Sequence, residues 1–292
     1  MRKKWNRWTL YDTVVSTILF VVILVTLYPM YYVFIASISD PAQLVSYLGP
    51  LFTPLGIDFS SYAMVFENPM VGRGYLNTLL YMTVGTVVNV SLTILGAYVL
   101  SRKKLFWGRA LRFLVVFTMF FSGGMIPFYL TVDAVGLSGH WLAVILPYAV
   151  NPMNLIIMRT SFLSVPPSLE ESACLDGATA VTVLTRIIIP LSMPVVAVMI
   201  LFYGVGHWNS WFSAMMFIRE REQLPLQMIL REILILNSTE SMMTGTSTAD
   251  KAPLTETVKY ATIMVATLPI LFVYPFLQRY FVKGVMVGAV KE

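Results

Sequence analysis

The amino-acid sequence predicts an all-α, polytopic membrane protein with six transmembrane helices. Of its 292 residues, 57% are hydrophobic and 12% are charged, whereas about a quarter of the residues of a soluble domain are charged. The mean hydropathy is +0.74. Six stretches come close to the roughly 20 apolar residues that cross the hydrocarbon core. Helices are expected there because a helix satisfies its own backbone hydrogen bonds in lipid.

The six candidate spans form one transmembrane domain that covers residues 1–292. Several of them contain proline, for example Pro29, Pro147 and Pro269, so we expect kinks of the kind that neighbouring helices tolerate. In chain order, the spans are residues 13–36, 76–100, 111–132, 141–160, 191–212 and 258–281.

The Lys and Arg residues are distributed unevenly between the two sides of this topology. Fourteen of the 20 fall on the side that holds both termini, so both termini are predicted to be cytoplasmic by the positive-inside rule. The net charge of +5 therefore reflects topology and lipid headgroups, and it does not indicate a nucleic-acid partner. A long extracytoplasmic loop, residues 213–257, contains a predicted helix at 224–236 followed by a Ser/Thr/Gly-rich segment.

The cytoplasmic loop 165–190 carries an unusual polar helix between two apolar segments. Pro166 and Pro167 are expected to end any helix that precedes them. Ser168, with Glu171 three residues later, predicts a capping box at the start of the next helix. Gly177 permits a bend or close backbone approach before a second helix. The alternative, on local physics alone, is that Glu171 only caps the helix and Asp176 is a solvated turn residue.

The order of these residues resembles the signature of the membrane subunits of ATP-binding-cassette importers. Ser172 stands in place of the usual first alanine, and Leu184 stands where phenylalanine is common. The segments 101–112, 121–137, 206–212 and 278–292 also resemble maltose-type carbohydrate permeases, in the branch that handles complex oligosaccharides. The signature positions that match are Glu171, Ala173, Asp176, Gly177, Ala178, Ile187, Pro190 and Pro194.

The resemblance implies a type I importer permease of the bacterial inner membrane that works by alternating access. Its expected partners are a second homologous permease, two cassette ATPases, an extracytoplasmic substrate-binding protein, membrane lipid and an oligosaccharide. The branch favours an acidic, uronic-acid oligosaccharide, with neutral glucans left open. The sequence has no phosphate-binding loop, so ATP hydrolysis is expected on a separate subunit. The resemblance also implies that Asp176 caps the helix after the bend. The residues expected to couple to that ATPase are Glu170, Glu171, Ala173, Asp176, Gly177, Ala178 and Pro190.

Polar and aromatic residues near the predicted spans are candidates for the substrate pathway. An interfacial aromatic belt explains the tryptophans equally well, and hydrogen bonds between helices explain the asparagines. The candidates are Tyr129, Asn151, Asn154, His207, Trp208, Asn209 and Trp211. In the long outer loop, Thr244, Gly245 and Thr246 lie where the resemblance places a contact with the binding protein, and a disordered connector is the alternative.

Other function classes find little support. Two histidines and one cysteine, far apart in sequence, predict neither a metal site nor the nucleophile and base of a membrane-embedded enzyme, and no cofactor is expected. A self-sufficient secondary transporter or channel is the alternative to an importer subunit. Such proteins place ionisable residues inside the membrane, and the six spans contain almost none.

Overall fold

The computed structural model describes residues 9–102, 105–243 and 257–272, and the regular elements among these residues are all helices. The chain divides into two compact units, Met1–Pro69 with Leu230–Thr267, and Met70–Ile229 with Leu268–Glu292. The predicted all-α class is confirmed, whereas a single domain over residues 1–292 stays a prediction.

The first unit is built around the end of a long apolar helix. Helix α1 (Leu10–Ser37) begins at a capping box formed by Thr9 and Asp12, and only its last turn is buried. That turn packs on the short helix α2 (Pro41–Ser46) and on the loop that follows, in a small cluster that includes Ile35, Leu44 and Leu51. Helix α3 (Ser60–Glu67) completes the part of this unit that precedes α4.

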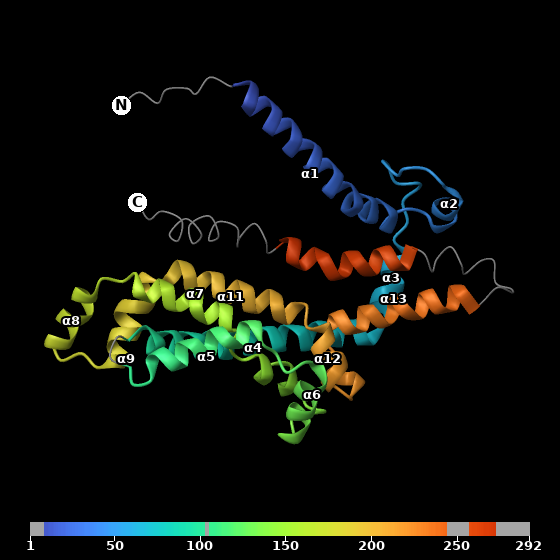
Figure 1. The fold of residues 1–292 in the computed structure, drawn as a ribbon. Coiled ribbons are helices and arrows are strands. Elements are labelled where there is room, and N and C mark those ends of the chain that lie inside the picture. Colours follow the sequence, from blue (N-terminus) through green and yellow to red (C-terminus); the bar gives the residue numbers. More distant parts are fainter. Residues whose placement is uncertain (1–8, 103–104, 244–256, 273–292) are drawn as a thin grey trace. The chain divides into compact units, whose positions relative to one another are not determined.

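The second unit contains the longest helix, α4 (Pro69–Ser101, 33 residues), and a bundle of shorter helices (Figure 1). Its hydrophobic core joins α4 to α7, to the π-helical turn η3 and to α11 through Ala97, Met158, Ile188 and Met199. The other elements of this unit are α5 (Gly108–Phe120), α6 (Met125–Ala134), η1 (Trp141–Val144), η2 (Leu146–Tyr148), α7 (Pro152–Leu163), α8 (Pro167–Leu175), α9 (Ala180–Val183), η3 (Leu184–Ile188), α10 (Ile189–Leu191), α11 (Met193–Trp208), α12 (Trp211–Phe217) and η4 (Arg221–Gln223). Helix α13 (Leu226–Met243) begins in this unit, and its residues from Leu230 on belong to the first unit.

The apolar helices fit a membrane protein, although several are bent. In the described part of the chain, α1 and α4 are each long and apolar enough to cross a membrane, and counting each bent pair as one span raises the number to five. The bends are 120° between α5 and α6, 48° before α7 and 85° before α11. A shorter apolar helix, Thr257–Phe272, overlaps the sixth predicted stretch. The number of six transmembrane spans therefore remains a prediction.

Two predicted spans are broken in the structure. The stretch 141–160 comprises η1 and η2 followed by α7, with a bend of 48°. The stretch 111–132 was expected as one helix, but it is divided between α5 and α6. The separating residues include Gly123 and Gly124, and Gly124, the N-cap of α6, has a φ of 85°, a conformation outside the right-handed helix that glycine adopts without steric cost. The apolar composition of this stretch predicted a membrane span, but it did not predict the break between α5 and α6.

Candidate functional site

Helix α8 is the polar helix that the sequence predicted in the 165–190 loop. It begins at Pro167, with Pro166 as its N-cap, and no side chain caps it. The predicted capping box between Ser168 and Glu171 is therefore wrong. Proline is favoured at the first helical position because its missing N–H needs no partner there, and its φ is already helical. The second proline thus moves the start of the helix ahead of Ser168.

The end of α8 is a Schellman motif centred on Gly177. The Gly177 N–H donates to the Cys174 carbonyl at 3.1 Å, and the Ala178 N–H donates to the Ala173 carbonyl at 2.9 Å. Gly177 has a φ of 82°, and a Cβ placed on it would meet nothing within 4 Å. Within this chain, glycine is required here by the backbone conformation and not by a close neighbour.

Asp176 was expected to cap the helix after the bend, and this expectation is wrong. Asp176 is the C-cap of α8, whereas α9 is capped by Thr179, whose hydroxyl accepts the Thr182 N–H at 3.3 Å. Threonine at an N-cap satisfies one of the free N–H groups of the first turn as aspartate would. Asp176 remains exposed at the turn.

One face of α8 is fixed to the Ser101 end of α4. Arg102 forms a bidentate ion pair with Glu170, in which Nη2 donates to Oε1 at 3.0 Å and Nη1 donates to Oε2. The Arg102 guanidinium also lies 4.2 Å from the centre of the Tyr98 ring, and its Nε donates to the Tyr98 carbonyl at 3.3 Å. Next to this pair, Ala173 and Ala178 pack against the core of the unit.

The electrostatics of this contact follow from its partial burial. Burial alone lowers the pKa of Arg102, but the hydrogen bonds that it donates to Glu170 and the charge of that carboxylate outweigh burial and raise the pKa of Arg102 above its usual value. An arginine guanidinium stays charged at physiological pH whatever its surroundings. Bidentate pairs between arginine and a carboxylate are stronger and more directional than single contacts.

The opposite face of α8 is open. Glu171 and Ser172 are exposed, and the Leu175 side chain is 89% exposed. The neighbouring residues Glu170 and Glu171 therefore differ in their surroundings, because Glu170 is bound within the chain and Glu171 faces outward. A capped, anchored helix with an exposed leucine and carboxylate on its free side is suited to contact another protein.

Pro190 lies in α10, directly after the π-helical turn η3 and before the 85° bend that leads into α11. Proline cannot donate to the carbonyl one turn earlier, and a π-helical turn changes the hydrogen-bond register around that missing donor. Ser192 closes the bend, and its N–H donates to the carbonyls of Ile188 and Ile189 at 3.0 Å. The segment that carries α8 and α9 is thus connected to α11 through a defined corner.

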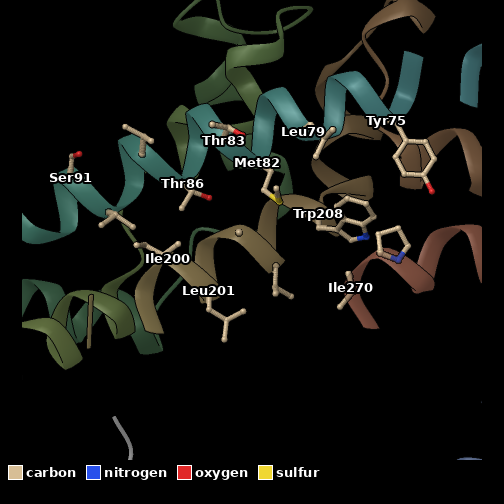
Figure 2. Close-up of a pocket in the computed structure, with 15 residues that line it drawn as sticks. Tyr75, Leu79, Met82, Thr83, Thr86, Ser91, Ile200, Leu201, Trp208 and Ile270 are labelled. Carbon is tan, nitrogen blue, oxygen red and sulfur yellow. The ribbon is translucent and has the colours of Figure 1, made fainter. Parts of the chain in front are cut away.

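A cavity of about 820 Å³ lies in the second unit against one side of α4 and α11 (Figure 2). Its wall is mainly aliphatic, with hydroxyl groups from α4 and a tryptophan from the end of α11. It contains no Lys, Arg, Asp or Glu among its described lining residues. The residues that line it are Tyr75, Leu79, Met82, Thr83, Thr86, Val87, Val90, Ser91, Ile200, Leu201, Gly204, Val205, Trp208, Pro269 and Ile270.

Of the seven predicted pathway residues, Trp208 lines this cavity, with its ring centre 6.3 Å from that of Tyr75. His207, its neighbour, is buried against α4 instead. Its Nε2 lies 3.3 Å from the Asn89 amide nitrogen, which also donates to the Tyr148 carbonyl at 3.3 Å. A Cβ on Gly85 would lie 2.4 Å from His207 Nε2, so the glycine makes room for the imidazole.

The other predicted pathway residues serve local structure in this chain. Asn151 caps α7 by accepting the Asn154 N–H at 3.1 Å, and its own N–H donates to the Tyr203 hydroxyl at 3.0 Å. Asn154 is buried. Asn209 donates to the Val205 carbonyl at 2.9 Å.

The two predicted aromatic residues pair with neighbouring rings. The Tyr129 ring stacks on Phe217 with 5.8 Å between the ring centres, and Trp211 contacts Phe212 edge-on at 5.5 Å. Thr244, Gly245 and Thr246, the predicted contacts with a binding protein, lie outside the described residues. The structure thus does not bring the predicted pathway residues together at one place.

Sequence reasoning missed the α4 wall of the cavity and the partner of Glu170. Thr83, Thr86 and Val90 recur at helical spacing on one side of α4, and this pattern within an apolar span was a usable signal. Arg102 offered none, because it is 68 residues from Glu170 and was counted only as a cytoplasmic charge. In the described part of the chain, no group of three or more His, Cys, Asp or Glu residues is placed to hold a metal ion.

Comparison with known proteins identifies the family. The model of the binding-protein-dependent transport system inner membrane component matches residues 90–287. The Bacillus subtilis (strain 168) polygalacturonan/rhamnogalacturonan transport system permease protein YtcP is 38% identical over 97% of this chain and 98% of its own length. Protein LplC of the same organism is 40% identical over 91% of this chain and 90% of its own length.

A solved structure agrees with this assignment. The crystal structure of a bacterial ABC transporter involved in the import of the acidic polysaccharide alginate superposes with a TM-score of 0.83 at 32% identity. The match covers 96% of this chain and 99% of the other. The predicted resemblance and the predicted fold family are confirmed. The chain belongs to the binding-protein-dependent transport system inner membrane components, the permease subunits of ABC importers, which are transport proteins and not enzymes.

Proposed function

We propose that this chain forms half of the translocation pathway of an importer for acidic oligosaccharides. It pairs with a second, homologous permease, binds two ATPase subunits on the cytoplasmic side and receives substrate from an extracytoplasmic binding protein. Both termini are cytoplasmic, as the excess of Lys and Arg on that side indicates. The observation that carries the substrate class is the likeness, at 38% and 32% identity, to a polygalacturonan/rhamnogalacturonan permease and to an alginate transporter.

The cavity indicates what this half of the pathway contributes. The hydroxyl groups of Thr83, Thr86 and Ser91 and the rings of Tyr75 and Trp208 are suited to a sugar's hydroxyls and apolar faces. The described lining offers no cation for a uronate carboxylate. We therefore assign recognition of the carboxylates to the partner permease and the binding protein, and the accommodation of the sugar rings to this chain.

Coupling to ATP hydrolysis runs through α8 in this proposal. Its free face, with Glu171 and Leu175, docks on an ATPase subunit, and Gly177 and Ala178 complete the turn that shapes the docking segment. Closure of the ATPase pair moves the two permeases and turns the pathway from one side of the membrane to the other. The chemistry of ATP remains on the ATPase, because this chain lacks a phosphate-binding loop.

The test is purification of the tagged chain from its own membranes in a mild detergent. We expect a second permease and an ATPase, the ATPase in twofold amount, to co-purify. Isolation of this chain as a stable homo-oligomer without an ATPase would contradict the proposal and would favour a self-sufficient transporter.

The substrate class has a separate test in the same complex. With the binding protein present, trigalacturonate is expected to stimulate ATP hydrolysis, whereas maltotriose, a neutral sugar of the same length, is not. Stimulation by maltotriose alone would assign the transporter to neutral glucans. The subunit arrangement would stand in that case, because the purification tests it independently.

A further inference from the structure

The two adjacent carboxylates on α8, those of Glu170 and Glu171, have different surroundings. Glu171 is exposed, whereas the Glu170 side chain is only 20% exposed and is bound by Arg102. Arg102 directly follows Ser101, the last residue of α4, and Arg102 is 68 positions away from Glu170 in sequence. The ion pair therefore joins α8 to a helix that is neither of its neighbours in the chain.

The environment of Arg102 makes this joint stiff. Beyond the two hydrogen bonds to Glu170, its Nη2 donates to the Ser101 hydroxyl at 3.1 Å and its Nε donates to the Tyr98 carbonyl. The Tyr98 ring supports the guanidinium from one side at 4.2 Å. A guanidinium held in this way has lost most of its rotamer freedom, so the pair acts as a fixed connection and not as a mobile surface contact.

A second contact fastens α7 to the same end of α4. Arg159 donates from Nε to the Leu100 carbonyl at 2.9 Å, and Phe162 of α7 belongs to the same core cluster as Leu100. The Ser101 end of α4 is thus the place where α7, the helix before the 165–190 loop, and α8, the first helix within that loop, are both attached. From there α4 continues as one helix of 33 residues, about 50 Å long, whose side chains line the cavity.

We propose that Arg102 and Glu170 form a coupling joint that transmits the movement of α8 directly to α4, the wall of the cavity. This inference rests on the proposed role of α8 as the ATPase-docking helix, and it adds the route by which the docking movement reaches the pathway. Arg102 and Glu170 are positioning residues in this scheme, and Glu171 with Leu175 contacts the ATPase.

The joint is tested by distance measurement in the complete transporter. Cys174, on α8, is the only cysteine of the chain and is exposed, and Val99→Cys places a second exposed thiol near the Ser101 end of α4. With spin labels on both, and partner subunits free of cysteine, we expect one narrow distance that is the same without nucleotide and with trapped ATP. A distance that changes on ATP binding in the parent complex would overturn the proposal, because α8 would then move independently of α4.

Charge exchange separates the joint from a purely structural role. Arg102→Glu is expected to broaden the distance and to lower the trigalacturonate transported per ATP hydrolysed by roughly three- to tenfold, the range typical of coupling residues. Arg102→Glu combined with Glu170→Arg is expected to restore a narrow distance and at least half of the transport ratio. The proposal would be overturned if Arg102→Glu transported as much trigalacturonate per ATP as the parent. It would also be overturned if the double variant kept a narrow distance between the labels but did not recover transport.

A matched control lies at the other end of α4. Arg73 pairs with Glu222 at 3.0 Å, but the two side chains are 54% and 68% exposed, and such pairs contribute little. Arg73→Glu should leave the distance between the labels unchanged.

Failure of the proposed function is recognised separately: no ATPase would co-purify with the parent chain. If trigalacturonate is not a substrate, the distance measurement still tests whether Arg102 and Glu170 connect α8 to α4.

Discussion

The contact of α8 with the Ser101 end of α4 and the contact between α4 and α11 both involve polar side chains, but the interactions differ in kind. At α8, a charged pair between Arg102 and Glu170 is partly open to water. Between α4 and α11, neutral groups are fully buried: Asn89 lies against His207, and the Thr93 hydroxyl lies 2.7 Å from that of Tyr203.

The difference follows from the surroundings of each contact. A charge within the hydrocarbon is costly, so helices there are joined by neutral hydrogen bonds and close packing. At the membrane surface, a partly hydrated ion pair costs less to form and gives a direction to the contact. The polar helix can therefore be anchored by charge on one face while its other face stays free for a partner.

The largest expected effect concerns the free face of α8. Leu175→Glu places a charge where we propose that an apolar side chain enters a pocket of the ATPase, and truncation of such an anchor typically costs about 2 kcal/mol or more. We expect the ATPase to be lost from the purified complex, as measured by the ratio of subunits after affinity purification. Leu48→Glu, a change at an even more exposed leucine in the first unit, is the control and should keep the ATPase.

The contact between α4 and α11 should be most sensitive at Gly85. Gly85→Ala places a methyl group 2.4 Å from the buried His207 ring, and overpacking of this kind costs about 1–3 kcal/mol. Unfolding in mixed detergent and SDS should show the loss.

Gly72→Ala is the control on the same helix, since a Cβ there meets nothing within 4 Å. It should leave stability unchanged or raise it by up to about 1 kcal/mol, the helix propensity gained on replacing glycine by alanine. Equal stability of the two variants would show that α4 and α11 do not approach each other as described.

The smallest expected effect distinguishes two reasons for Gly177. If only its left-handed backbone is required, Gly177→Ala should weaken ATPase binding by about 1 kcal/mol, whereas Gly177→Asn, which tolerates this conformation, should bind nearly as the parent does. Titration of the ATPase onto the labelled permease complex measures both. An equal loss in the two variants would instead mean that the partner approaches the glycine too closely for any side chain.

Composition and residue order predicted the class of the protein and the position of α8, because long apolar stretches and a spaced signature are properties of the sequence alone. The starts of α8 and of α9 were predicted wrongly. Pro167 competes with Ser168 for the start of the helix, and Thr179 takes the capping role expected of Asp176. Both errors concern a choice between two nearby residues of similar capping or initiating ability, which local preferences decide only weakly.

The arrangement of the site was less predictable than the helix that carries it. The pairing of Arg102 with Glu170, and of Asn89 with His207, joins residues 68 and 118 positions apart. Such pairs depend on how the helices pack, and no local pattern encodes them. The spacing of Thr83 and Thr86 on α4 did encode a polar stripe, but without the fold it did not indicate a cavity.

The most direct test of the central proposal is photo-crosslinking from position 175 in native membranes. With benzoylphenylalanine in place of Leu175, we expect irradiation to join this chain to an ATPase subunit, and the same residue in place of Leu48 to give no such product. Crosslinks from position 175 to lipid alone, or to another copy of this chain, would contradict the assignment of α8 as the helix that couples the permease to ATP hydrolysis.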